Sequence, residues 1–595
     1  MQLIRRFRIP ALCCALCVLF CALVSRPYAE MGICDDGPYI LMARHLARTG
    51  NVVYNGWAAP MLGWQLYLGA AFIKLFGFSF TTVRMSSLLV AVCMAFVLQR
   101  TLARAGINER NATLGTLAFV LSPLYLMLSV TYMSDTDGLF AVVLCLYGCL
   151  RSLQAPSERS TIFWLCFAAA ANAIFGTSRQ IAWLGILVMV PSALYSLAQV
   201  GVPGWRGKLR ERRRVLLAGS AVTLVGAIFV FTCMEWLKHQ PYTIPERLIV
   251  RRGEEFDVSR QVMGAIFDIP FLFLPVAALF SPELRRSVRS TVTALSLVCL
   301  AYVSVPLAAY QLRGRFQFPR LLEPSMGDWA SQYAGYAGQL GAGHGPAFLC
   351  FGERMALTIV SLGGLLGLGL LLSRPREDSS ELAGSGSIRW RQLCLLIGPF
   401  VAAQTLLLIP RAGSDAGLYD RYLLEPLAVA LPWLVRLYQE RVQVRMPTVA
   451  LPLVATWAIY GIVTTHDMFS LYRARVALAA ELRASGLPDT SVDYGWESNL
   501  LTEIDRSGHT NDPQVEVPLH AYAPAPPLPV GSCLMLDYDF TPHIRPLYGV
   551  SFDPHACYGP APFAPVHYSR WPYRTPGTLY VVRYLPSSQI PHRMP

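Results

Sequence analysis

Long apolar blocks, each of about 16 to 23 residues, recur along this chain and constrain its fold more than any other feature. A helix of that length crosses the hydrocarbon core of a bilayer. Over the full 595 residues the composition is 54% hydrophobic and only 15% charged, which suits lipid rather than water as the main solvent. The sequence therefore predicts a mainly α, polytopic membrane protein.

The number and length of the apolar blocks predict about thirteen transmembrane helices. They are expected at 10–25, 81–103, 114–130, 138–153, 161–176, 181–198, 215–236, 264–280, 291–310, 354–373, 391–410, 423–438 and 447–465. The first is interpreted as an uncleaved helix, because Pro27 occupies a position where a signal-peptide cleavage site needs a small side chain.

Basic residues indicate the orientation of these helices. The motifs "RRFR", "QRTLARAGINER", "RSLQAPSERS", "GWRGKLRERRR" and "RLYQERVQVR" all fall on one side, which the positive-inside rule makes cytoplasmic. The formal charge of +13 is explained by these loops, and no basic stripe with interleaved aromatics indicates a nucleic-acid partner. We expect a cytoplasmic N-terminus and an integral protein of a bacterial inner membrane, in contact with membrane lipid.

Two regions on the side opposite the basic loops are long enough to form secondary structure of their own. In the first external loop, 26–80, "DGPYILMARHLARTG" predicts a surface helix that ends at Gly50, and "MLGWQLYLGAAFIKLFG" an interfacial helix. The domain 466–595 contains short β-like runs such as "GTLYVVRYLP", and we expect a small extracytoplasmic α/β domain after a transmembrane domain of residues 1–465. Cys533 and Cys557 in this tail could form a disulfide if it lies outside the cytoplasm.

Charged side chains at the external ends of the predicted spans are the candidates for chemistry, because such positions are costly unless paired or functional. They are Asp35, Asp36, Arg84, Asp135, Asp137, Arg179, Asp415, Asp420, Arg421, His466 and Asp467. Carboxylates can take a proton from a hydroxyl or hold a metal, whereas arginines suit a phosphate by charge and geometry. Together they would suit transfer from a lipid phosphate.

Each candidate also has a structural interpretation. Asp35 could cap the helix that follows it, and Asp135 and Asp137 could cap the fourth span. Arg84 and Arg179 could extend toward lipid head groups. Arg421 could pair only with Asp420 or Asp415, and His45 is expected on the surface of its helix.

The motifs as a set resemble the GT-C superfamily of membrane glycosyltransferases, in particular the branch of the protein O-mannosyltransferases and the lipid A aminoarabinose transferase. "DDGPYILMARHLARTG" is similar to that branch's acidic pair, tyrosine and helix, and "GWQLYLGAAFIKLFGFSFTTVRMSSLLVAV" to its juxtamembrane helix and arginine-led span. "MSDTDGLFAVVLCLYGCL" and "YDRYLLEPLAVALPWL" resemble an acidic segment that opens the fourth span and a late Arg-Tyr-Leu-Leu-Pro motif. The Lys-Pro-Pro of the aminoarabinose transferases is absent, since Ala59 and Pro60 stand there, so another cation must hold the carrier phosphate and aminoarabinose is not implied as the sugar.

The resemblance implies a glycosyltransferase that moves a hexose or pentose from a polyprenyl phosphate donor to an acceptor hydroxyl with inversion. The acceptor is a glycan, a lipid or a protein, in the setting of cell-envelope glycosylation. We expect Asp35, Asp36 and Asp135 as catalytic residues, with Asp35 as the general base. The residues expected to bind substrate or carrier phosphate are Tyr39, Arg84, Asp137, Arg179, Arg421 and Tyr422.

Two alternatives accompany this expectation. Oxygen ligands from Asp35, Asp36 and Asp135 would allow a divalent cation, but we expect no cofactor to be required. A transporter or flippase of a lipid-linked sugar would also place arginines and aspartates at phosphate height, but it should show internal duplication, broken spans and charges near the membrane centre.

Overall fold

The computed structural model describes residues 2–57, 61–199, 213–244, 268–286, 349–374, 388–412, 418–525, 538–554 and 559–584 apart from 572 and 574, together with the single positions 265, 292 and 345. The predicted span 291–310, Asp415, Ala59, Pro60, Cys533 and Cys557 fall outside this description, apart from the single position 292.

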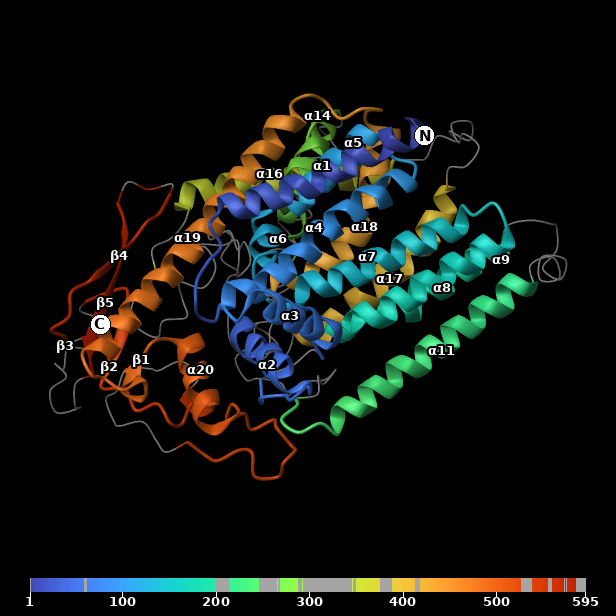
Figure 1. Ribbon diagram of the computed structural model, residues 1–595. Helices are drawn as coiled ribbons and strands as arrows, with labels where there is room; N and C mark the ends of the chain where they lie inside the picture. The colour runs from blue at the N-terminus through green and yellow to red at the C-terminus, as the bar shows by residue number, and fades with distance from the viewer. Residues whose placement is uncertain are drawn as a thin grey trace, which may run out of the picture.

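A bundle of mostly apolar helices makes up most of the molecule (Figure 1). Its members are α1 (Gln2–Val24), α4 (Phe80–Arg104), α5 (Glu109–Val120), α6 (Pro123–Leu128), α7 (Ser134–Leu153), α8 (Glu158–Phe175), α9 (Val190–Gln199), α11 (Arg213–Lys238), α16 (Phe351–Ser373), α17 (Trp390–Ala412), α18 (Leu424–Arg441) and α19 (Ala450–Ala484). Within the described residues, seven helical segments are long and apolar enough to cross a membrane. The predicted mainly α, polytopic architecture is confirmed, whereas the predicted number of thirteen spans is not.

Two predicted spans differ from the structure in an instructive way. The segment 114–130 is not one helix but two, because Ser122 caps a new helix whose first residue is Pro123. Proline at that position lacks an amide hydrogen that could continue the preceding helix. In the span predicted at 264–280, the described helical residues 268–272 end at a turn at Phe273, and the short helix α13 (Leu274–Ala277) and a 3-10 turn follow.

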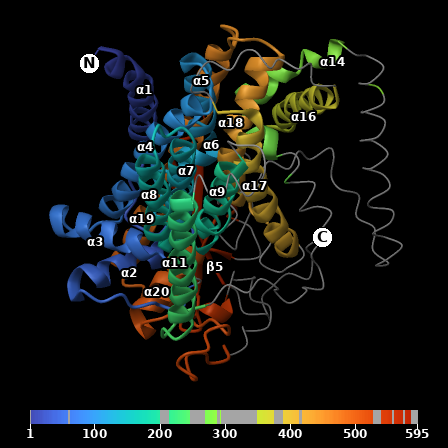
Figure 2. The same ribbon diagram turned by 90° about the vertical axis from the view of Figure 1, so that its right-hand side faces the viewer.

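One continuous apolar core joins α1, α4, α5, α6, α7 and α18. Helix α11 lies at the edge of the bundle, against α8 and α9, with most of its surface uncovered by protein (Figures 1 and 2). The exposed side chains of α11 are mostly apolar, among them Leu224, Val225 and Phe231, which suits contact with lipid.

The loop between α1 and α4, residues 25–79 and hereafter the first loop, carries two helices, as predicted. Helix α2 (Asp36–Thr49) ends at Gly50, whose φ of 79° closes the helix in the left-handed conformation that glycine adopts without strain. Helix α3 (Gly63–Phe76) packs on α2 and on α4. His45 is exposed, as expected.

Helix α19 carries the chain into a small C-terminal domain. The predicted domain boundary at residue 466 lies inside this helix, which continues without a break to Ala484. Beyond it, β1 (Val492–Asp493), β2 (Tyr548–Ser551), β5 (Gly577–Arg583) and β3 (Gly559–Pro560) form a sheet in that order, and β4 (Val566–Tyr568) also pairs with β5. The pairing of β1 with β2 is parallel and the other pairings are antiparallel.

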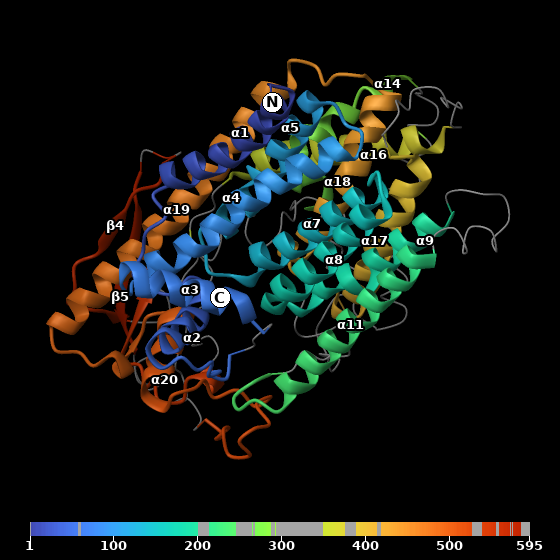
Figure 3. The same ribbon diagram turned by 45° about the vertical axis from the view of Figure 1, so that its right-hand side comes forward.

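Helix α20 (Trp496–Ser507) of this domain lies beside α2 of the first loop (Figures 1 and 3). The first loop is therefore held between the helical bundle and the C-terminal domain, and this is the place where the predicted site residues gather.

Candidate functional site

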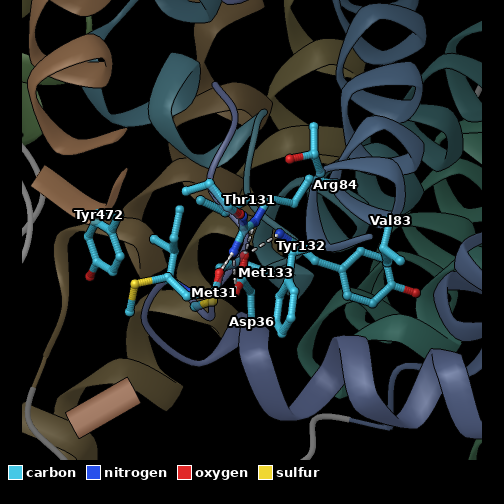
Figure 4. A network of polar contacts seen from close by, with 12 residues as sticks. Met31, Asp36, Val83, Arg84, Thr131, Tyr132, Met133 and Tyr472 are labelled. Atoms are coloured by element: carbon cyan, nitrogen blue, oxygen red, sulfur yellow. Dashed lines mark hydrogen bonds and ion pairs between the residues drawn. The ribbon is translucent and has the colours of Figure 1, made fainter. Parts of the chain in front are cut away.

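A fully buried ion pair, Asp36 with Arg84, fixes the start of α2 against α4 (Figure 4). The Arg84 Nε atom donates to Asp36 Oδ2 at 2.7 Å and its Nη2 to Oδ1 at 3.0 Å, so the pair is bidentate. Arg84 also donates to the carbonyl oxygens of Ala29 at 2.7 Å and Met31 at 2.5 Å. All three nitrogens of this guanidinium thus hold Asp36 or the segment that leads to it.

The Asp36 carboxylate is equally occupied. Besides Arg84 it accepts from the backbone amides of Ile33 at 2.7 Å and Tyr132 at 3.2 Å. Its contacts therefore tie together the first loop, α4 and the segment before α7. We call this ion pair, with its hydrogen bonds, the Asp36–Arg84 anchor. Because both side chains have no exposed surface, neither is placed to meet a substrate directly.

Asp35, the neighbouring residue, has a different environment. It occupies the N-cap position of α2, yet its side chain makes no capping hydrogen bond, so the capping interpretation does not account for it. The preceding residue, Cys34, adopts a φ of 55°, a left-handed conformation that is uncommon outside glycine and clusters at functional sites. The Asp35 side chain keeps 19% of its surface exposed, in contrast to the anchor beside it.

Asp35 belongs to a group of alternating opposite charges, the carboxylate–arginine cluster, formed by Asp35, Asp135, Arg179, Arg421 and Glu425. Arg421 Nη2 lies 3.5 Å from Asp35 Oδ2, and its Nε lies 3.9 Å from Asp135 Oδ1. Arg179 pairs with the same oxygen of Asp135 and lies 3.8 Å from Glu425 Oε1. Four of the predicted site residues are thus brought together from regions far apart in the sequence.

Close packing of the backbone places Arg179 in this cluster. Met61 and Arg179 form an isolated antiparallel bridge, and the Leu62 amide donates to the Ser178 carbonyl oxygen at 3.2 Å. Gly138 in α7 leaves room for the arginine, because a Cβ atom there would lie 2.9 Å from both Arg179 Cδ and Glu425 Oε1. The glycine of "SDTDG" therefore permits Arg179 and Glu425 to meet against α7.

Tyr422 lies between three arginines. Its ring centre is 5.2 Å from the Arg179 guanidinium carbon, 4.6 Å from that of Arg411 and 5.5 Å from that of Arg421. The Arg411 Nη2 atom also donates to the Tyr422 hydroxyl at 2.9 Å. Such cation–π contacts hold the arginines near one another despite their like charge.

Sequence reasoning missed Glu425, Arg411 and Gln404. Gln404 Nε2 donates to Glu425 Oε2 at 2.6 Å, so this glutamate is held by an amide as well as by Arg179. The available signal was the position of Glu425 and Arg411 at the ends of apolar helices, where an ionisable group is costly unless it has a function or a partner.

Other predicted residues are not members of the cluster. Asp137 is fully buried in α7, and neither of its carboxylate oxygens has a hydrogen-bond partner among the described residues. Asp420 accepts from the amide of Arg421 at 2.7 Å. His466 stacks on Trp571 with ring centres 3.7 Å apart, and Asp467 accepts from the Trp571 amide at 2.9 Å, so these two residues hold the C-terminal domain.

The environment of Asp35 perturbs its acidity. Burial raises the pKa of its carboxyl group above the ordinary value, the positive charge of Arg421 lowers it, and the negative charge of Asp135 raises it again. Tyr39, one helical turn further along α2, is buried near the same carboxylate, and burial followed by the charge of Asp35 raises its pKa well above the usual value. A base with a raised pKa is better matched to a hydroxyl than an ordinary aspartate is.

The three aspartates predicted as possible metal ligands are Asp35, Asp36 and Asp135. Asp36 is committed to the anchor, and Arg179 and Arg421 occupy Asp135. In the part of the chain that the structure describes, no group of three or more His, Cys, Asp or Glu side chains could hold a metal ion. The described residues therefore do not fit the three-aspartate cation site.

The anchor makes a stability prediction. Replacing Arg84 by Met leaves the Asp36 carboxylate buried without its counter-charge, and we expect a loss of about 3–5 kcal/mol. The double variant Asp36→Asn with Arg84→Met removes both charges and should be more stable than Arg84→Met alone. Thermal unfolding in detergent measures both. Equal melting temperatures for the wild type and Arg84→Met would contradict the anchoring role.

Comparison with known proteins gives similarities of fold. No protein-family model and no curated protein matches the chain. Among solved structures, it is similar to ArnT from Cupriavidus metallidurans, with 17% identity, coverage of 81% of this chain and 82% of that one, and a TM-score of 0.39. The archaeal oligosaccharyltransferase AglB from Archaeoglobus fulgidus, solved with an inhibitory peptide and a dolichol-phosphate, shows 11% identity, coverage of 89% and 63%, and a TM-score of 0.35.

A further similarity is to the protein O-mannosyltransferase Pmt1-Pmt2 complex of S. cerevisiae bound to the sugar donor, with 13% identity, coverage of 43% and 36%, and a TM-score of 0.30. These are the kinds of protein that the sequence motifs resemble. At such identities, and with TM-scores below 0.5, they are likenesses only, and what the site can do follows from the residues of this chain.

Proposed function

We propose that the protein is an integral membrane glycosyltransferase that moves a sugar from a polyprenyl phosphate donor to an acceptor hydroxyl, with Asp35 as the general base. The observation that carries this proposal is the contrast between two adjacent aspartates. Asp36 is wholly occupied in the anchor, whereas Asp35 is held beside it, partly exposed, uncapped and 3.5 Å from Arg421. Such placement of a carboxylate that neither caps its helix nor belongs to the anchor favours catalysis.

In this proposal the acceptor hydroxyl gives its proton to Asp35 as its oxygen forms a bond to the anomeric carbon. The bond between that carbon and the phosphate oxygen breaks on the opposite face, and its electron pair leaves with the polyprenyl phosphate. The configuration is therefore inverted, and the reacting groups gain from being held in line. Proton, sugar and leaving group are all accounted for without a further reactant.

Arg179 and Arg421 are the proposed ligands of the donor phosphate, with Tyr422 orienting them. Both guanidiniums share Asp135, and arginine suits phosphate through paired N–H groups. We assign Arg84 to the anchor instead, because each of its three guanidinium nitrogens already donates a hydrogen bond there. Asp135 then positions the two arginines and does not contact the sugar. Tyr39 lies beside the base, Asp35.

The side of the membrane follows from the positive-inside pattern. We propose that the site faces the extracytoplasmic space of a bacterial inner membrane, with a cytoplasmic N-terminus and the C-terminal domain outside. The acceptor there is a glycan, a lipid or a protein of the cell envelope.

The first test is transfer of radiolabelled sugar from a panel of polyprenyl phosphate sugars in membranes that contain the protein. We expect Asp35→Asn to lower the rate by about 10²–10⁴-fold, the usual worth of a general base. Its stability should hold, because the side chain caps nothing. Asp505→Asn, the same change at an exposed position of α20, is the matched control. Full activity of Asp35→Asn would refute the base, and labelled lipid crossing liposomes without acceptor would indicate a transporter.

The pH dependence gives a second test. A general base must be deprotonated, so activity falls as the pH drops through the pKa of Asp35. Arg421 lowers that pKa, and Arg421→Gln should therefore move the acid limb of kcat/KM to higher pH. Arg483→Gln, which removes an arginine that pairs with Asp489, should leave the limb in place. A shift to lower pH in Arg421→Gln would contradict the assignment.

We further propose that transfer needs no divalent cation, since guanidiniums supply the positive charge around Asp35 and Asp135. Treatment with EDTA followed by gel filtration should leave the initial rate of transfer unchanged. Loss of activity that Mg²⁺ or Mn²⁺ restores would show that a cation is required.

A further inference from the structure

The C-terminal domain touches the loop that carries Asp35. Gly32 and Gly37 flank this loop, and they pack face to face: a Cβ atom added at either would lie 3.1 Å from the Cα atom of the other. Leu501 of α20 lies over both, with Cδ1 at 3.5 Å from the Cβ position of Gly32 and Cδ2 at 3.2 Å from that of Gly37. The two glycines close the loop, and the leucine covers the closure.

Helix α20 is itself firmly held. Glu497 at its start pairs with Arg475 of α19 at 2.8 Å, both side chains being buried, and accepts from the Tyr472 hydroxyl. Trp496 packs edge-on against Trp57 of the first loop, with ring centres 4.8 Å apart. Leu501 therefore projects from a rigid helix rather than from a mobile tail.

A second contact supports the far side of the same loop. The Thr510 amide, which follows α20, donates to the Asn55 carbonyl oxygen at 2.8 Å. The Asn55 side chain donates in turn to the Pro38 carbonyl oxygen in the first turn of α2, at 3.0 Å. The C-terminal domain thus reaches the start of α2 by two separate routes.

We propose that Leu501 is a positioning residue for Asp35, and that the C-terminal domain clamps the catalytic loop against the Asp36–Arg84 anchor. The inference rests on the proposed function, because it gives Asp35 the role of the base. The anchor fixes the loop at Asp36 from the side of the helical bundle, but Asp35 has no capping bond of its own. The orientation of the Asp35 side chain therefore depends on how closely Gly32 and Gly37 pack against each other.

The test compares three variants of the full-length protein. Leu501→Ala removes the cover from the glycine pair, Leu501→Met retains its volume, and Leu482→Ala truncates a fully buried leucine of α19 that packs in the core of the C-terminal domain. Hydrogen exchange of residues 32–40 reports the order of the loop independently of activity. Steady-state transfer reports kcat and KM for the donor.

We expect faster exchange over residues 32–40 in Leu501→Ala and a kcat lowered by about 10–100-fold with KM changed less than threefold, because a small misplacement of a reacting group is costly. Leu501→Met should keep kcat near the wild-type value. Leu482→Ala should lower the stability of the protein but change neither the hydrogen exchange of residues 32–40 nor kcat.

Unchanged exchange in Leu501→Ala would overturn the clamp. Faster exchange with unchanged kcat, while Asp35→Asn is inactive, would show that the contact does not position the base. If Asp35→Asn keeps its activity, the base and its positioning residue both fail, whereas the exchange data still show whether Leu501 holds the loop.

Discussion

The bidentate pair of Asp36 and Arg84 is the interaction on which the arrangement of this molecule depends. It lies where water is excluded, so neither charge could remain there alone. The cost of burying them is offset only because the remaining donors and acceptors are also used, by Ala29, Met31, Ile33 and Tyr132. A pair satisfied in this way has a single geometry, and that geometry sets the start of α2.

The same ion pair gives two adjacent aspartates, Asp35 and Asp36, different environments. Helix α2 begins at Asp36, so Asp35 is carried to the outside of the first turn, toward Arg421 and Asp135. The left-handed Cys34 completes the turn that allows this. Asp36 holds the fold together, and under the proposed function Asp35 is the base. Environment, rather than residue type, makes the difference.

Much of this architecture follows from sequence, because apolar block length, helix stops and basic loops are local signals. Gly50 ends α2 and "GTLYVVR" forms β5 as their local chemistry dictates. The pair Ser122–Pro123 is a local signal that divides the predicted span 114–130 into two helices, but the length of the apolar block alone does not show it. That Asp36 rather than Asp35 pairs with Arg84 could not be predicted, because the two aspartates are adjacent and the arginine lies 48 residues away.

The carboxylate–arginine cluster shows why long-range placement matters for function. Its five members come from the first loop, α7, the turn after α8, and the segment 421–425 that opens α18, and each alone resembles an ordinary helix end. In the resting protein the arginines are neutralised by Asp35, Asp135 and Glu425, which keeps a group of cations stable beside lipid. Under the proposed function, an arriving phosphate competes for Arg421 and so weakens its hold on Asp35. Donor binding would then raise the basicity of the carboxylate at the moment when the acceptor needs it.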